Sequence, residues 1–131
     1  MFLSRWLISL IALLGLDGCW IYFFMGTFFK SQVGHLMRAD LQWTGVLACY
    51  FVMHACLYYF VIRDRGVQKS ADAYIASAIM GLGLFGVYEL TNYATIQGWP
   101  LKLVIVDTTW GTLLCMAVVG ITRMLHTGAR A

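Results

Sequence analysis

Apolar residues fill four long runs of this chain, and few charged residues interrupt them. The runs cover residues 6–29, 41–62, 73–101 and 103–122. The second run has no Asp, Glu, Lys or Arg, and each of the others contains one acidic residue. A helix of about 20 residues crosses the hydrocarbon core of a bilayer. The pattern therefore predicts one transmembrane domain, residues 1–131, with spanning helices at about residues 6–27, 43–62, 73–95 and 101–122.

The segments between the runs predict how the helices are connected. Phe28–Asp40 is expected to form a polar loop, and Arg63–Asp72 a short charged turn. Gln97–Pro100 predicts a tight turn, because Gly98 can end one helix and Pro100 fits the first turn of the next. Short connections make consecutive helices antiparallel neighbours. We therefore expect an all-α integral membrane four-helix bundle with up-down-up-down topology and short loops.

The composition agrees with a membrane protein. Hydrophobic residues make up 61% of the chain and charged residues 11%, with a mean hydropathy of +0.77. Soluble domains average about 45–50% apolar and about 25% charged residues. The net charge of +3 is modest and does not suggest nucleic acid as a partner. The expected surroundings are the lipid bilayer.

Basic residues are unevenly distributed between the two sides of the predicted bundle. The side that holds both termini carries six of them, namely Arg5, Arg63, Arg65, Lys69, Arg123 and Arg130. The other side carries three, namely Lys30, Arg38 and Lys102. Cytoplasmic segments hold an excess of Lys and Arg. This asymmetry favours a multi-pass protein of the cell (inner) membrane with both termini in the cytoplasm.

Three carboxylates, Asp17, Glu89 and Asp107, lie inside the apolar runs. A charge at that depth costs roughly 2.5–3.5 kcal/mol on insertion scales, so such residues often have a function. Glu89 lies about six residues before the predicted end of the third helix, and Asp107 about six residues after the next helix begins. At 1.5 Å per residue, both lie roughly 9–10 Å below the interface. Asp17 and His54 are near the middle of the first two helices, so we predict one polar intramembrane cluster.

The residues around this cluster support the prediction. Asn92 follows Glu89 by three residues and shares its helix face. Gly111 lies one turn beyond Asp107, and a small residue there allows close helix approach. Tyr50, His54 and Tyr58 repeat every four residues, a stripe that we interpret mainly as packing. Gly81, Gly83 and Gly86 are interpreted as packing notches.

The intramembrane acids have a structural and a functional interpretation. They could fix helix packing by hydrogen bonds, or form a site for protons, cations or a polar substrate. Burial favours the neutral form of a carboxyl, so we expect at least one to be protonated at neutral pH. His54 is either a hydrogen-bonded core residue or a proton relay beside Asp17. One histidine, scattered acids and four in-span cysteines do not define a metal site, so no metal or cofactor is predicted.

Several motifs of the chain resemble a known family. They are Leu16-Asp17-Gly18-Cys19-Trp20, Leu90-Thr91-Asn92-Tyr93-Ala94-Thr95, Trp99-Pro100 and Asp107-Thr108-Thr109-Trp110-Gly111. Together they resemble domain-of-unknown-function family 2177, small multi-pass bacterial membrane proteins. The resemblance implies a four-helix membrane protein in which eight positions are signature residues, namely Asp17, Trp20, Asn92, Trp99, Pro100, Asp107, Trp110 and Gly111. We take Trp20, Thr91, Trp110 and Gly111 as residues that support the polar cluster.

The sequence departs from the family pattern at Glu89, where the family usually has Asp. The retained acid with a longer side chain favours a proton site or hydrogen-bond network over a strict metal shell. His54 falls on no motif of the family.

Three functions fit the sequence. The first is a small proton- or cation-linked transporter or binding protein that uses the buried carboxylates, for which a homo-oligomer could help to form a path. The second is a non-catalytic accessory or assembly subunit of a membrane complex. The third is an intramembrane lipid-modifying enzyme with carboxylates as general acid and base, although no nucleophile is recognisable. The sequence thus leans away from an enzyme, and catalytic residues stay unassigned.

Overall fold

The protein is almost entirely helical. The computed structural model describes residues 2–63 and 70–128. Its elements are α1 (Phe2–Trp20), a π-helical turn η1 (Ile21–Met25), α2 (Gly26–Val33), a 3-10 turn η2 (Gly34–Leu36), α3 (Trp43–Leu57), a second π-helical turn η3 (Tyr58–Ile62), α5 (Ser70–Thr95) and α6 (Leu101–Gly128). Within these ranges there is no strand. The expected all-α class is confirmed.

Four helical segments of the described chain are long and apolar enough to cross a membrane. They are Leu3–Leu36, Trp43–Ile62, Ser70–Thr95 and Leu101–His126. Each contains an 18-residue window of high mean hydropathy, with values of 2.0, 1.8, 1.5 and 1.8 in that order. Many of their large apolar side chains face outward, and Phe23 and Val87 are 79% and 68% exposed. Because lipid solvates such side chains, a bundle of this kind needs no further protein layer.

The first helical segment differs from its predicted form. We expected a helix that ends near residue 27 and a polar loop at Phe28–Asp40, but α2 and η2 continue the helix to Leu36. Polar side chains such as Lys30 end an apolar run without ending a helix, since backbone bonding continues residue by residue. The helix ends after Leu36, because Met37 adopts an extended backbone. The predicted turn Arg63–Asp72 falls mostly on residues 64–69, which lie outside the described residues.

The turn η1 adjusts the buried face of the first segment. The amide of Gly26 bonds to the carbonyl of Ile21, five residues earlier, and a Cβ at Gly26 would lie 2.7 Å from that oxygen. Asp17 and Met25 are both buried although eight residues separate them. In a regular α-helix, two side chains eight residues apart point in directions that differ by about 80°. The wider π-helical turn removes most of this angular difference, so both side chains can face the core.

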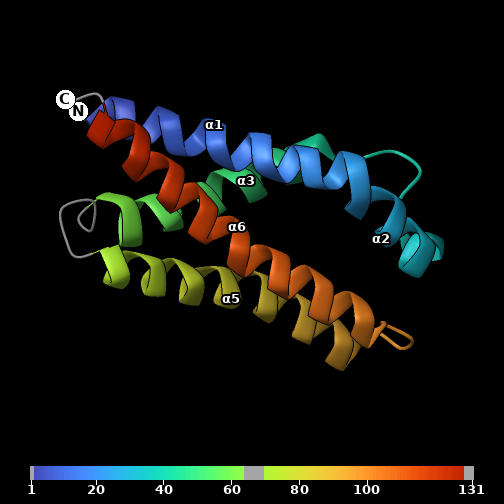
Figure 1. The fold of residues 1–131 in the computed structure, drawn as a ribbon. Coiled ribbons are helices and arrows are strands. Elements are labelled where there is room, and N and C mark those ends of the chain that lie inside the picture. Colours follow the sequence, from blue (N-terminus) through green and yellow to red (C-terminus); the bar gives the residue numbers. More distant parts are fainter. Residues whose placement is uncertain (1, 64–69, 129–131) are drawn as a thin grey trace.

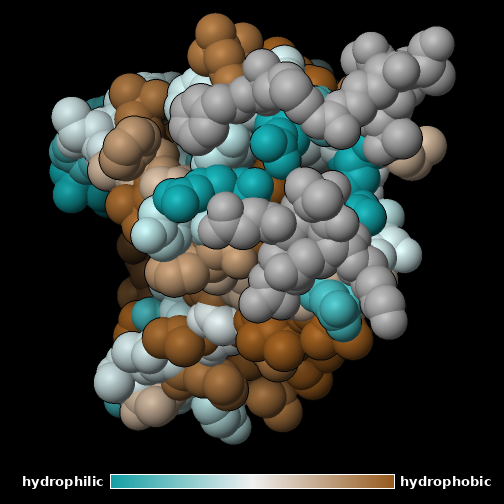
Figure 2. Space-filling model, turned by 90° about the vertical axis from the view of Figure 1, so that its left-hand side faces the viewer, coloured by the Kyte–Doolittle hydropathy of each residue, from teal (hydrophilic) through white to brown (hydrophobic). Residues whose placement is uncertain are grey.

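The spans alternate in direction, as expected (Figure 1). The start of α1, the end of η3, the start of α5 and the end of α6 lie at one end of the bundle, here called the terminal end. A hydrogen bond from Arg5 Nη1 to the carbonyl of Arg63, at 3.3 Å, joins two spans there. Figure 2 looks onto this end and shows hydrophilic residues gathered above a largely apolar lower surface.

Helix α6 holds the bundle together by packing on both α5 and α1 (Figure 1). One apolar cluster near the terminal end includes Leu13, Leu57 and Leu114. A second cluster, nearer the opposite end, includes Met25, Trp99 and Leu103. Along α1 and α6 the two clusters are separated by the buried Asp17 and Asp107.

The closest approach of two helices is at Gly81 of α5 and Gly111 of α6. A Cβ at Gly81 would lie 2.3 Å from the carbonyl oxygen of Gly111, and a Cβ at Gly111 would lie 2.1 Å from the Phe85 ring. Gly86 makes only ordinary contact, and Gly83 faces open space. Among the three glycines that we interpreted as notches, only Gly81 requires the absence of a side chain.

We predict that Gly81→Ala destabilises the protein because its methyl group would overlap the α6 backbone. Overpacking of this kind costs about 1–3 kcal/mol. Thermal unfolding in detergent should show a lowered Tm for Gly81→Ala and an equal or higher Tm for the matched control Gly83→Ala. Equal Tm values for both variants and the unsubstituted protein would contradict the proposed close contact.

Candidate functional site

Three buried carboxyl groups from three helices meet between the apolar clusters. Asp17 of α1 is 7% exposed, Glu89 of α5 is 0% exposed, and Asp107 of α6 is 9% exposed. Glu89 and Asp107 are neighbours whose carboxyls are near enough to act on each other, and Asp17 is near enough to act on Asp107 electrostatically. The antiparallel turn between α5 and α6 produces this pairing, since it places residues equally far from the turn side by side.

Asp17 is fully supplied with hydrogen-bond donors. The hydroxyl of Tyr50 donates to Oδ2 at 2.5 Å, and the indole Nε1 of Trp110 donates to Oδ1 at 2.9 Å. The Trp110 ring stacks on Trp20 with ring centroids 4.4 Å apart and an interplanar angle of 9°. Asp17 therefore joins α1 to α3 and α6 through neutral donors.

Glu89 is only partly supplied with donors. The indole Nε1 of Trp99 donates to Oε2 at 2.8 Å, whereas the buried Oε1 accepts no hydrogen bond from a described donor. The buried hydroxyl of Thr108, next to Asp107 in the chain, also lacks a partner. Glu89, Asp107 and Thr108 thus offer oxygen atoms, and no Lys or Arg of the described chain pairs with either acid.

The turn between α5 and α6 positions the Trp99 indole. Gly98 has φ of +80°, a conformation that L side chains rarely adopt. The amide of Trp99 bonds back to the carbonyl of Ile96, and the Pro100 carbonyl accepts the first amides of α6. The turn therefore folds Trp99 back onto α5, where its ring is 8% exposed.

His54 lies in a different polar contact. Its Nε2 is 2.9 Å from the hydroxyl of Ser9, which also bonds to the Trp6 carbonyl, and its ring packs edge-on against Trp6 at 5.1 Å. Ser9 precedes Asp17 by about two helical turns, so this contact lies toward the terminal end. The structure does not bring His54 to the carboxylates, and the expected relay beside Asp17 has no contact to support it.

The remaining candidates take different positions. Asn92 is half-buried, with its side chain within hydrogen-bonding reach of the Tyr88 hydroxyl instead of Glu89. Thr91 is exposed, and its carbonyl accepts the Thr95 hydroxyl. Gly111 acts through the close approach of α5 and α6.

Sequence reasoning missed two donors of the site. Tyr50 was interpreted as part of a packing stripe, although a phenol one turn before a buried histidine could have been tested as a partner for a buried acid. Trp99 is a signature position in the family motif, and its motif with Pro100 is the signal that could have marked it as a donor. Both rings supply neutral N–H or O–H donors to acids that have no cation nearby.

The part of the chain that the structure describes holds no group of three or more His, Cys, Asp or Glu side chains placed to bind a metal ion. The carboxyl pair presents oxygen atoms, which can bind a proton or a small cation. A carboxyl pair can form a hydrogen bond only if one of its members carries a proton.

The comparison with known proteins gives a family match. A family model described as "Predicted membrane protein (DUF2177)" matches residues 2–124. No curated protein and no solved structure matches the chain.

We predict that Tyr50→Phe and Asp17→Ala each lower stability, because each removes the hydrogen bond that joins α1 to α3. Single interhelical hydrogen bonds in membranes contribute about 0.6 kcal/mol, with a maximum near 1.7. A double-mutant cycle on unfolding free energy should give a positive coupling of that size. Tyr93→Phe, with a half-exposed ring, is the control, and zero coupling between Tyr50 and Asp17 would contradict the contact.

Proposed function

We propose that this chain, which belongs to the DUF2177 family of predicted membrane proteins, is a small proton- or cation-linked transporter or binding protein. Its binding site in this proposal is the carboxyl pair of Glu89 and Asp107. The observation that carries the proposal is that a completely buried carboxyl faces a second carboxyl with no cation of the described chain to neutralise them.

Electrostatics supports this choice of site. Two like charges in a buried pair repel strongly, and sharing one proton removes the repulsion and allows a hydrogen bond. Titratable groups inside a membrane often mark proton or ion routes. The unpartnered oxygens of Glu89 and Thr108 support a site that accepts a further proton or a small cation.

Asp17 supports the second candidate, an accessory or assembly subunit whose acids hold the bundle together. Both of its oxygens accept bonds from fixed neutral donors, an arrangement suited to a structural anchor. We therefore assign different roles to the acids: Asp17 for packing, and Glu89 with Asp107 for binding. No contact of the cluster favours the lipid-modifying alternative, which stays a prediction from the sequence.

We predict a protonated carboxyl at neutral pH. Infrared spectra of the reconstituted protein should contain a protonated-carboxyl band that the double variant Glu89→Gln with Asp107→Asn abolishes. Asp72→Asn, at an exposed acid in the first turn of α5, should leave the band unchanged. The shared proton is contradicted if the band is absent from mildly acidic to mildly alkaline pH, or if it persists in the double variant.

The same variants separate the two candidate functions. Proteoliposomes with an entrapped pH-sensitive dye should show proton uptake that the double variant loses and Asp72→Asn keeps. Uptake that the double variant keeps would exclude the transport proposal. If the double variant lowers thermal stability but leaves the cellular phenotype intact, the accessory role is favoured.

We also propose that the terminal end faces the cytoplasm of a bacterial cell. The support is the excess of basic residues on that side of the sequence, six against three, by the positive-inside rule. A reporter enzyme that folds only outside the cytoplasm should be inactive when fused after Ala131. Activity of that fusion would reverse the orientation.

A further inference from the structure

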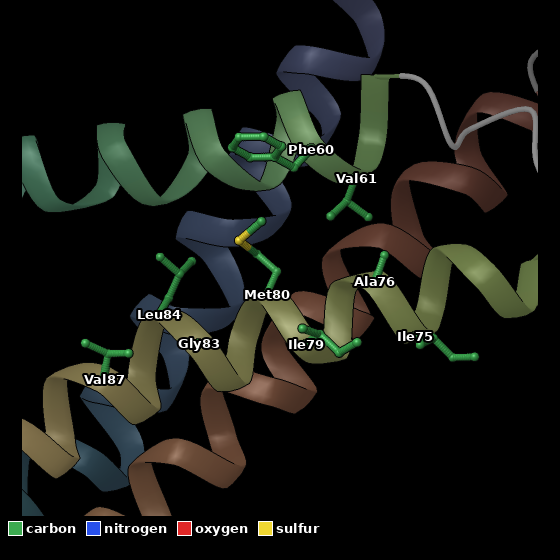
Figure 3. Close-up of a pocket in the computed structure, with 9 residues that line it drawn as sticks. All are labelled: Phe60, Val61, Ile75, Ala76, Ile79, Met80, Gly83, Leu84 and Val87. Carbon is green, nitrogen blue, oxygen red and sulfur yellow. The ribbon is translucent and has the colours of Figure 1, made fainter.

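An apolar groove lies on the outside of the bundle, between η3 and α5 (Figure 3). Its volume is about 570 Å³. Phe60 and Val61 form one wall, and α5 residues between Ile75 and Val87 form the other wall and the floor. Met80 and Leu84 point across the groove toward η3 in Figure 3. No charged or hydrogen-bonding side chain lines it.

The groove is open to an occupant from the membrane. Phe60, Ile79 and Val87 are 60%, 64% and 68% exposed. Gly83 lies on the floor, and a Cβ added there would meet no atom within 4 Å. The space above this glycine therefore suits a slim, flexible and apolar group.

The length of the groove matches one leaflet. From Ile75 to Val87 the helix rises about 18 Å at 1.5 Å per residue, and half of the hydrocarbon core is about 15 Å thick. The groove begins five residues after the start of α5 and stops before its end at Thr95. A spanning helix from a second copy of the chain would need a contact surface across the whole core, so the length favours a lipid acyl chain.

Two arginines lie at the terminal end of the bundle, next to the end of η3. Arg63 follows Val61 by two residues, and its guanidinium lies 4.9 Å above the Tyr59 ring. Arg5 contacts the backbone of Arg63 from α1. Guanidinium groups bind phosphate oxygens well. Asp72, in the first turn of α5, is the acidic residue that precedes the groove along this helix.

We propose that this groove binds an acyl chain of an anionic phospholipid from the leaflet at the terminal end, with the headgroup near Arg63 and Arg5. The apolar walls select a hydrocarbon chain, the length selects one leaflet, and the basic end selects a negative headgroup. The site is independent of the carboxyl pair, which uses other faces of α5 and α6.

Native mass spectrometry tests this site on the full chain after reconstitution with equal amounts of phosphatidylglycerol and phosphatidylcholine. Gly83→Leu fills the floor and should clearly lower the retained phosphatidylglycerol, because its side chain would occupy the space that is open above Gly83. Gly45→Leu is the matched control, because Gly45 of α3 is also exposed and also faces open space. It should retain lipid as the unsubstituted protein does.

The preference for an anionic headgroup is tested by removing the charge of a basic side chain. Arg63→Gln should reduce the preference for phosphatidylglycerol over phosphatidylcholine about fivefold, the effect of roughly one basic residue at an anionic surface. Lys102→Gln, at the opposite end, should not change it. Equal retention of the two lipids by the unsubstituted protein would overturn the anionic headgroup.

Further outcomes would overturn the proposal that the groove binds an acyl chain. One is unchanged lipid retention in Gly83→Leu, and another is a dimer that this variant loses while lipid stays bound, which would indicate a second copy as the occupant. If Gly83→Leu does not fold, Ile79→Ser serves in its place, because Ile79 lines the groove and is exposed. Its control is Ile105→Ser on α6, where the side chain is 59% exposed.

Discussion

The need to satisfy carboxyl groups inside an apolar bundle without cations organises much of this protein. The apolar runs that hold Asp17, Glu89 and Asp107 contain no Lys or Arg, and an unsatisfied polar group in hydrocarbon costs several kcal/mol. Aromatic donors supply the bonds instead. Trp110 and a tyrosine hold Asp17, and Trp99 holds Glu89. The bonds to Asp17 connect α1 to α3 and α6, which are far apart in sequence, whereas the bond to Glu89 ties α5 to the turn that follows it.

The acids differ in how completely they are satisfied. Asp17 has a donor for each oxygen, and changing its charge would leave two oriented donors without a carboxylate. Glu89 has one oxygen without a hydrogen-bond donor and lies beside Asp107. This difference is the physical basis for proposing separate roles for the acids.

The approach of α5 to α6 sets the geometry of that pair. Gly81 and Gly111 remove the side chains where the two backbones come closest. Glu89 lies about two turns from Gly81, and Asp107 one turn from Gly111, so both carboxyls are on the side of the contact nearer the connecting turn. A methyl group at the glycine contact would push the helices apart and act on the carboxyl pair indirectly. The glycine contact and the carboxyl pair are therefore coupled, because both depend on how α5 packs against α6.

Apolar run length alone determined the four spans, because bilayer thickness fixes how many residues a spanning helix needs. The short turn before Pro100 likewise predicted that Glu89 and Asp107 are neighbours on adjacent helices, as the structure has them. Only the tertiary structure decided the partners of the acids and placed His54 with Ser9. Tyr50 and Trp110 are 33 and 93 residues from Asp17, and the rotation of each helix that brings them together depends on packing. The periodicity of apolar residues cannot predict that rotation, because nearly every face of a lipid-exposed helix is apolar.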